Sequence, residues 1–188
     1  SGRIKVQQAL AGQLITEKKV VAASVDEGMV VSDPERDILK MIVMNRYSPA
    51  EPAMDFVSGF GLKRGAIAST VAHDCHNIIA VGADDASIAR AVNMLVEAKG
   101  GIACVEGADT QADDVMILPL PVAGIMSAED GFTVAENYKL INRKVKNLGS
   151  SLDAPFMTLS FMALLVIPAL KLSDKGLFDG LSFSFTSL

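Results

Sequence analysis

The alternation of apolar and polar residues predicts that the first half of the chain is built mainly of strands. Residues 1–25 alternate in short pieces, SGRIKVQQALAGQLITEKKVVAASV, which is typical of hairpin-forming strands. The run from Ile38 to Tyr47 is apolar and contains β-branched residues, so it predicts a largely buried strand. The segment from Ser48 to Ala53 carries two prolines and predicts a loop. Residues Ala66 to Val71 and Ile78 to Val81 predict two further core strands.

Beyond residue 84 the apolar spacing changes to that of a helix. A helix is predicted with Asp84 or Asp85 as N-cap and Gly100 at its end, because Ile88, Ala91, Val92, Leu95 and Val96 follow helical spacing. The stretch GIACVEG then returns to the pattern of a strand. In the following stretch VMILPLPV, Pro119 and Pro121 indicate an edge position or an exit from the sheet.

The last third of the chain contains one clear helix and one ambiguous run. A helix is predicted to begin near Ser127, where SAED forms a variant of the capping box with Asp130, and to end at Gly149. Its apolar face is Val134, Tyr138, Ile141, Val145 and Leu148. The run FMTLSFMALLVI, residues 156–167, fits either a buried helix or a pair of core strands.

The uncharged stretch of residues 154–170 is close to the lower length limit for a membrane span. Its two prolines, together with Thr158 and Ser160, favour a buried core segment instead. Strands mixed with helices in this order predict an α+β (mixed α/β) fold. We expect a single domain over residues 1–188, with several strands and two or three helices packed on the sheet.

Composition narrows the class of protein. The formal net charge is -5 and the pI is near 5.0, and the lysines and arginines form no basic stripe, so nucleic acid and anionic membranes are not expected as partners. The two cysteines, Cys75 and Cys104, do not form a disulfide framework, which indicates a reducing, cytoplasmic setting. Cys104 lies in a predicted strand and is interpreted as a small buried hydrophobic residue.

The stretch TVAHDCHN, residues 70–77, contains both histidines of the chain and connects two predicted core strands. His73, Asp74, Cys75 and His76 are side chains that zinc accepts, and an imidazole beside a carboxylate can act as a general base. A closed zinc site usually needs four ligands, however, and the chain has no second His or Cys pair, so no metal site is predicted. Two interpretations stay open. Either Asp74 and Asn77 satisfy the backbone of a turn while the histidines donate to carbonyls, or the cluster belongs to a site completed by other residues.

A second candidate lies just upstream, in GFGLKRGAIAST. Gly59, Gly61 and Gly65 surround the basic pair Lys63 and Arg64, and such a loop can bind an anion through its backbone N–H groups. The spacing matches neither a P-loop nor the GxGxxG fingerprint of dinucleotide-binding folds. A tight turn before a strand is the alternative interpretation.

Four long blocks of the sequence stand out, in this order: DPERDILKMIVMNR, GFGLKRGAIASTVAHDCHNIIAVGADD, LPLPVAGIMS and PFMTLSFMALLVIPALKLSDKGLFD. Together with the opening SGRIKV they cover nearly the whole chain, and they resemble the C-terminal domain of bacterial adenine deaminases. Cys75 stands where the family commonly has serine, which argues against a role that needs a hydroxyl group there.

The resemblance implies an amidohydrolase that converts adenine and water into hypoxanthine and ammonia with a metal-activated hydroxide. In that family a pair of manganese or iron ions is expected in a TIM-barrel domain that precedes this region. This chain has two histidines and lacks the HxH pair of the barrel, so no cofactor is expected in the chain itself. The expected partners are the barrel domain and, in a homo-oligomer, further copies of the protein.

Within this resemblance, His73, Asp74, His76 and Asn77 are expected to form a fixed polar turn. The turn would face the barrel or a neighbouring subunit and help to close or shape the adenine pocket. The alternative function is a stand-alone purine-binding or oligomerisation module without catalysis.

Overall fold

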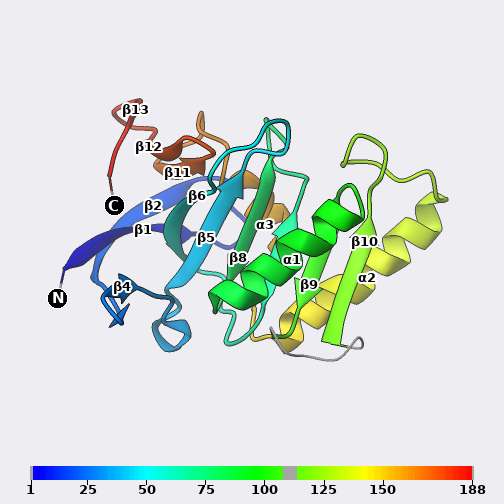
Figure 1. Cartoon of the computed structure of the whole chain (residues 1–188), viewed down its shortest axis with the longest axis horizontal. Helices are drawn as coiled ribbons and strands as arrows, with labels where there is room; N and C mark the ends of the chain where they lie inside the picture. Colours follow the sequence, from blue (N-terminus) through cyan, green and yellow to red (C-terminus); the bar gives the residue numbers. More distant parts are fainter. Residues whose placement is uncertain (1, 108–113, 188) are drawn as a thin grey trace.

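The computed structural model describes residues 2–107 and 114–187, and a large sheet forms its centre (Figure 1). Eight strands of the described residues belong to this sheet: β1 (Arg3–Ala9), β2 (Thr16–Ala22), β5 (Leu39–Met44), β6 (Ala53–Ser58), β7 (Ala66–Ser69), β8 (Ile78–Gly82), β9 (Gly101–Val105) and β10 (Val115–Pro119). Their order across the sheet is β10-β9-β7-β8-β5-β6-β1-β2. Neighbouring strands are antiparallel, except that β1 and β6 are parallel.

One face of the sheet carries helix α1 (Asp85–Glu97), which packs on β7, β8 and β9 (Figure 1). Successive strand residues point to opposite faces, so Ala66, Ala68 and Ala80 face this helix while their neighbours face away. These small side chains allow α1 to lie close to the sheet. The Asp84 carboxylate accepts a hydrogen bond from Ser87 N at 2.7 Å and caps the helix, as the sequence predicts.

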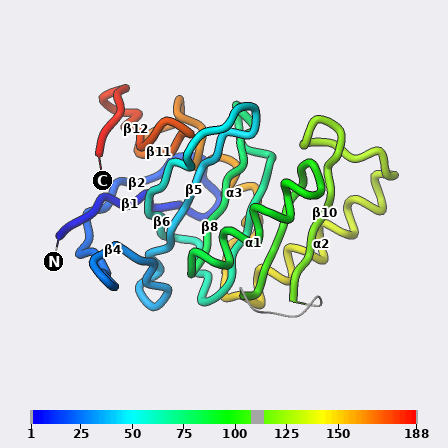
Figure 2. Tube along the Cα trace, viewed as in Figure 1, coloured from blue at the N-terminus to red at the C-terminus, as the bar shows by residue number. Residues whose placement is uncertain are grey.

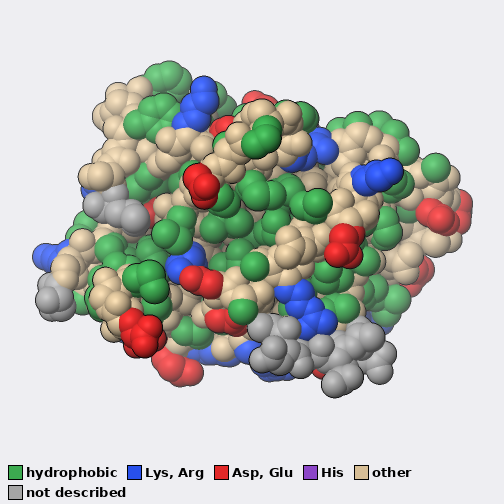
Figure 3. All heavy atoms as spheres, in the orientation of Figure 1, with side chains coloured by type: hydrophobic (Ala, Val, Ile, Leu, Met, Phe, Trp, Pro, Cys, Tyr) green, Lys and Arg blue, Asp and Glu red, His purple; other side chains and the backbone are tan. Residues whose placement is uncertain are grey.

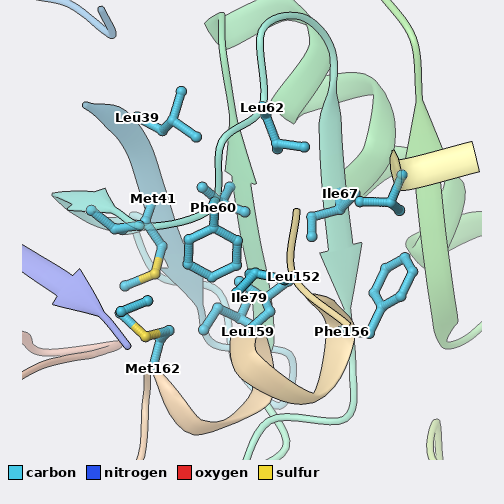
Figure 4. Packing of buried hydrophobic residues seen from close by; sticks show 14 of the residues in the cluster. Leu39, Met41, Phe60, Leu62, Ile67, Ile79, Leu152, Phe156, Leu159 and Met162 are labelled. Carbon is cyan, nitrogen blue, oxygen red and sulfur yellow. The ribbon is translucent and has the colours of Figure 1, made fainter. Parts of the chain in front are cut away.

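The opposite face carries helices α2 (Gly131–Asn147) and α3 (Pro155–Phe161) and a second sheet. The strands of that sheet are β11 (Leu170–Ser173), β12 (Gly176–Asp179) and β13 (Ser184–Phe185). Figure 4 shows the core between these layers, where Phe60 lies among side chains of β5, β8 and α3. Its members include Leu39, Met41, Leu62, Ile67, Ile79, Leu152, Phe156, Leu159 and Met162. Burial of such side chains stabilises each by about 1.5–3 kcal/mol relative to exposure.

A small hairpin, β3 (Val25–Asp26) and β4 (Met29–Val30), lies at the end of the sheet near the N-terminus (Figure 2). Val30 packs against Ile38 and Phe56 on the face that carries α1. A short 3-10 helix, Pro34–Arg36, follows the hairpin. Ala23 N donates to Gly2 O at 3.0 Å, so the start of β1 lies beside the hairpin.

The α+β fold with helices packed on the sheet is confirmed, and so are most of the expected elements. The N-terminal hairpin pairs β1 with β2, helix α1 starts after Asp84, and β10 occupies an edge of the sheet. The ambiguous run of residues 156–167 contains the short helix α3 followed by turns. The described residues contain no helix long and apolar enough to cross a membrane.

Three predicted boundaries are wrong. The strand expected from Ala66 to Val71 ends at Ser69. The strand expected from Ile38 to Tyr47 ends at Met44, because Asn45 Oδ1 accepts the N–H groups of Tyr47 and Ser48 at 2.8 and 3.0 Å and turns the chain. The helix expected from Ser127 starts at Gly131.

The later start of α2 has a simple cause, since Asp130 itself is the N-cap. Its carboxylate accepts Phe132 N at 3.0 Å and Thr133 N at 3.1 Å. These are the hydrogen bonds that the first turn of a helix otherwise leaves unmade. Strands β6 and β11–β13 lie in segments for which the sequence predicts no strand.

Candidate functional site

The stretch of residues 70–77 forms the turn that connects strands β7 and β8, as expected from the sequence. We call these eight residues the site turn. Thr70, which is buried, fixes its first end: its backbone N donates to Gly101 O at 3.0 Å, and its hydroxyl accepts Gly101 N at 2.8 Å. The same hydroxyl lies within hydrogen-bonding distance of Gly124 O. The start of the turn is therefore tied to strand β9 and to the loop after β10.

His73 fixes the middle of the site turn to helix α3. Its backbone N donates to Ser160 O at 3.0 Å. Its ring packs on the ring of Phe161, with 4.7 Å between centroids. His73 is half-buried by these contacts, whereas the neighbouring Asp74 and Cys75 are exposed. The turn thus presents a carboxylate and one face of an imidazole at the surface.

His76 adopts a left-handed backbone conformation, with φ of 51°. This region is uncommon for residues other than glycine, although histidine visits it more often than most. Two contacts hold it there: His76 N donates to Ala72 O at 2.6 Å, and Arg46 Nε donates to His76 O. The conformation is therefore imposed by the surrounding chain.

The loop after β5 supplies the residues that hold the second half of the site turn. A further guanidinium nitrogen of Arg46 donates to Ala123 O at 2.7 Å, and the hydroxyl of Tyr47 donates to Cys75 O at 2.8 Å. Gly124, with φ of 76°, leaves room for Arg46, because a Cβ atom there would lie 2.2 Å from the guanidinium Nη1. Arg46 thus joins three loops: the loop after β5, the site turn and the loop after β10.

The electrostatic environment of His76 favours its neutral form. Burial lowers the pKa of His76, and the nearby His73 and Arg46 lower it further, while Asp74 opposes them. The imidazole therefore carries one N–H donor and one acceptor nitrogen near neutral pH.

Two adjacent residues of the site turn keep buried polar atoms without partners. Within the described part of the chain, neither His76 Nδ1 nor Asn77 Oδ1 has a hydrogen-bond partner. The interpretation in which Asp74 and Asn77 satisfy the backbone of the turn and the histidines donate to carbonyls finds no partner for these two atoms among the described residues. Their hydrogen-bonding capacity is not used by residues 2–107 and 114–187.

The rings of His73 and His76 lie edge to face, with 5.8 Å between centroids. Among residues 2–107 and 114–187, no three His, Cys, Asp or Glu side chains are grouped so that they could hold a metal ion. The donor set of the site turn does not fit a metal centre on its own.

The backbone of the glycine-rich loop of residues 59–65 binds a carboxylate of the same chain. The carboxylate of Asp37 accepts Gly59 N at 2.6 Å and Gly61 N at 2.7 Å. Lys63 Nζ donates to Pro34 O at 2.8 Å, and Arg64 pairs with Glu106 at 3.3 Å. The interpretation as a tight turn is confirmed, since the N–H groups that would bind a ligand already bind Asp37.

Cys104 is fully buried in β9, and burial raises the pKa of its thiol to about 12. The thiol stays protonated at neutral pH, and the interpretation as a small buried hydrophobic residue is confirmed. Cys75 is a free, exposed thiol on the site turn.

The sequence does not single out Thr70, Arg46 and Tyr47, which hold the site turn. Nor does it single out Asp37, which binds the neighbouring glycine-rich loop. One signal was present, since the polar triplet Asn45, Arg46 and Tyr47 follows directly after a buried apolar run. Polar residues at the end of a core strand often carry function.

The amino-acid sequence matches the model of a known protein family. The family model of the adenine deaminase C-terminal domain matches residues 13–184. The chain therefore belongs to that family of C-terminal domains, as the four sequence blocks indicate.

Relatives in several organisms carry the name adenine deaminase. The chain is 53% identical over 186 residues to the one from Methanosarcina acetivorans, which covers 99% of this chain and 33% of the relative. It is 52% identical over 185 residues to the one from Salinibacter ruber, which covers 97% and 33%. For Sulfurovum sp. the identity is 53% over 182 residues, with 96% and 32% covered. The chain thus spans about a third of the length of these relatives, and it corresponds to the C-terminal domain of a larger protein.

Proposed function

We propose that this chain is the accessory C-terminal domain of an enzyme that deaminates adenine to hypoxanthine and ammonia. In this proposal the site turn faces a preceding barrel domain and helps to shape its adenine pocket. Support comes from the family match over residues 13–184 and from the name shared by relatives that are three times as long.

The observation that carries the role of the site turn is its unused hydrogen-bonding capacity in a fixed backbone. Thr70 and Arg46 hold the turn from both sides, yet the described residues offer no partner to the buried atoms His76 Nδ1 and Asn77 Oδ1. Native proteins pair most buried polar atoms, and each unpaired one costs about 1–3 kcal/mol. A buried polar atom without a partner is therefore a candidate contact for a group from outside the domain.

The manganese or iron pair implied by the family is proposed to lie outside this chain. Such a pair, when bound, activates the attacking water and stabilises charge on the purine ring. The side chains of the site turn do not fit a metal pair, so we assign them a positioning role: they orient neighbouring groups and limit access of water.

The test uses the full-length enzyme with the substitutions His73→Ala and His76→Asn. Asparagine tolerates the left-handed backbone of His76 and removes the imidazole. We expect each variant to lose at least about tenfold in kcat/KM for adenine, equivalent to about 1.4 kcal/mol. Metal content and Tm should stay near the wild-type values.

Lys175→Ala is the matched control, because Lys175 is an exposed polar residue in the turn between β11 and β12. It should leave both kcat/KM and Tm unchanged. If the two histidine variants keep wild-type turnover and lose only thermal stability, the site turn is a structural element and the proposed role is wrong.

The cytoplasmic setting and the homo-oligomer stay predictions. Size-exclusion chromatography with light scattering on the full-length enzyme would measure the oligomeric state directly. A mass of one polypeptide would contradict the expectation of a homo-oligomer.

A further inference from the structure

The face of the sheet that carries α1 is only partly covered. Helix α1 packs on β7, β8 and β9, and the β3–β4 hairpin packs on the other end. Between them the outward side chains of β5 and β6 line a cavity of 640 Å³. The side chains that define it are Met29, Ile42, Met54, Phe56, Ile88 and Val92, and we call it the apolar groove. Figure 3 shows hydrophobic side chains gathered in the middle of this face.

Two methionines at the rim of the apolar groove are unusually open to solvent. Met29 is 67% exposed and Met54 is 46% exposed. Methionine adapts its shape to a partner and is enriched in the core of protein interfaces. One ion pair lies at the groove, between the buried Lys40 and the exposed Asp85, with 2.7 Å from Nζ to Oδ2. The remaining lining is apolar, with the amide of Asn93 as an exception, so the surface suits a protein partner better than a charged ligand.

The apolar groove continues to the candidate site. Met44 lines it and also lines a second cavity of 520 Å³. That second cavity is bordered by Arg46, Tyr47 and Thr70, the residues that hold the site turn. The apolar groove and the cavity beside the site turn therefore adjoin each other at Met44.

We propose that the apolar groove is the docking surface for the N-terminal two-thirds of the same polypeptide. This inference rests on the proposed function, because it uses the longer enzyme of which this chain is one domain. Relatives share only 33% of their length with this chain, so a body about twice its size precedes it. Gly2 lies beside the β3–β4 hairpin that forms one wall of the groove, so a preceding segment reaches the domain next to this surface.

Methionine oxidation of the full-length wild-type enzyme tests the inference without a substitution. Hydrogen peroxide converts accessible methionine to its sulfoxide, and peptide mass spectrometry gives the rate at each position. Met126 and Met157, which are 53% and 51% exposed and lie outside the apolar groove, are the matched controls. Rates in the urea-unfolded enzyme give the unprotected reference for all four residues.

We expect Met29 and Met54 to react at least about fivefold more slowly than the two controls, each rate taken relative to the unfolded enzyme. Equal relative rates at all four methionines would overturn the inference. The footprint is recorded without adenine, so it is independent of turnover. An active enzyme with freely oxidised Met29 and Met54 would contradict the docking surface and leave the proposed function intact.

A second experiment distinguishes two possible occupants of the apolar groove: the N-terminal part of the same polypeptide and a second copy of the protein. Met54→Glu places a charge in the apolar groove, and Met157→Glu places one at a site of similar exposure elsewhere. If the N-terminal part covers the groove, Met54→Glu speeds oxidation of Met29 and leaves the molar mass from sedimentation equilibrium unchanged. A shift of Met54→Glu alone to a smaller species would assign the groove to a second copy and overturn the inference.

Discussion

Arg46, at the end of strand β5, holds the carbonyl of His76 in the turn between β7 and β8. Its Nε donates to His76 O, while a second guanidinium nitrogen donates to Ala123 O at 2.7 Å. One planar side chain thus ties the site turn to the loop after β10. A guanidinium group can make both bonds at once because its donors have a fixed fork geometry.

Arg46→Lys should loosen the site turn while keeping its charge. An ammonium group cannot reproduce both bonds with the same geometry, so we expect a loss of about 1–3 kcal/mol in unfolding free energy. We also expect a lower kcat/KM in the full-length enzyme. Urea denaturation and steady-state kinetics provide the two readouts.

Arg143→Lys is the control for this prediction, because Arg143 lies exposed on helix α2. It should change neither quantity. If Arg46→Lys also leaves stability and turnover unchanged, charge alone explains the role of Arg46.

Asp37→Ala should destabilise the glycine-rich loop of residues 59–65. The substitution removes the acceptor for Gly59 N and Gly61 N, which lie 2.6 and 2.7 Å from the carboxylate. Two charge-assisted hydrogen bonds are lost, so we expect a decrease of about 2–4 kcal/mol in unfolding free energy. Asp37 also has φ of 54°, a conformation that asparagine tolerates better than alanine.

Asp37→Asn should therefore recover part of the loss, and thermal denaturation of the two variants measures the difference. Asp26→Ala, in the exposed β3–β4 hairpin, is the control for a removed carboxylate. Equal stability of all three variants and the wild type would show that the loop does not depend on Asp37.

Asp55 makes the stability of the domain depend on pH. It is fully buried on β6, and Gln7 Nε2 donates to its Oδ2 at 3.0 Å. Burial raises the pKa of Asp55 from 3.8 to about 7, against the opposing effect of the Gln7 hydrogen bond. The folded chain therefore keeps a proton that the unfolded chain releases above pH 4, and stability falls as pH rises from about 4 to 7.

Asp55→Asn should remove that decline, because the amide stays neutral. At pH 8 we expect the variant to be more stable than the wild type by up to about 4 kcal/mol, and near pH 4 by little. Urea unfolding at both pH values measures the effect. Parallel pH profiles for the two proteins would contradict the assignment to Asp55.

Much of the fold can be predicted from the sequence because the interactions that form each element lie within that element. Helix α1 has a continuous apolar stripe and an aspartate cap, and both features act within one element. The strands missed by the sequence reasoning depend on distant partners. Strand β6 contains the buried ionisable residue Asp55 between apolar neighbours, and β11 contains the fully buried Lys171. In both strands a buried polar residue interrupts the run of apolar residues that would predict a core strand.

The buried charge of Lys171 is possible only through tertiary contacts. Its Nζ donates to Leu14 O at 2.9 Å and to Phe161 O at 3.0 Å. These carbonyls are 157 and 10 residues away in the chain, so no local window contains the whole arrangement.

The candidate site also depends partly on the local sequence and partly on contacts with distant residues. The position of the site turn between two core strands follows from the sequence, because apolar runs flank a polar stretch on both sides. Its anchors Arg46 and Tyr47 come from another loop, about 30 residues earlier in the chain. The unpaired atoms of His76 and Asn77 depend on that packing and have no signature in the sequence.

We propose that this domain supports an adenine deaminase and does not catalyse the reaction alone. Adenine-dependent ammonia release by the 188-residue chain with added manganese, beside the full-length enzyme, tests this proposal, with metal content determined by elemental analysis. We expect turnover by the full-length enzyme and none by the chain alone. Ammonia release by the chain above a control purified in parallel would contradict it, because the residues of the site turn would then form an active site by themselves.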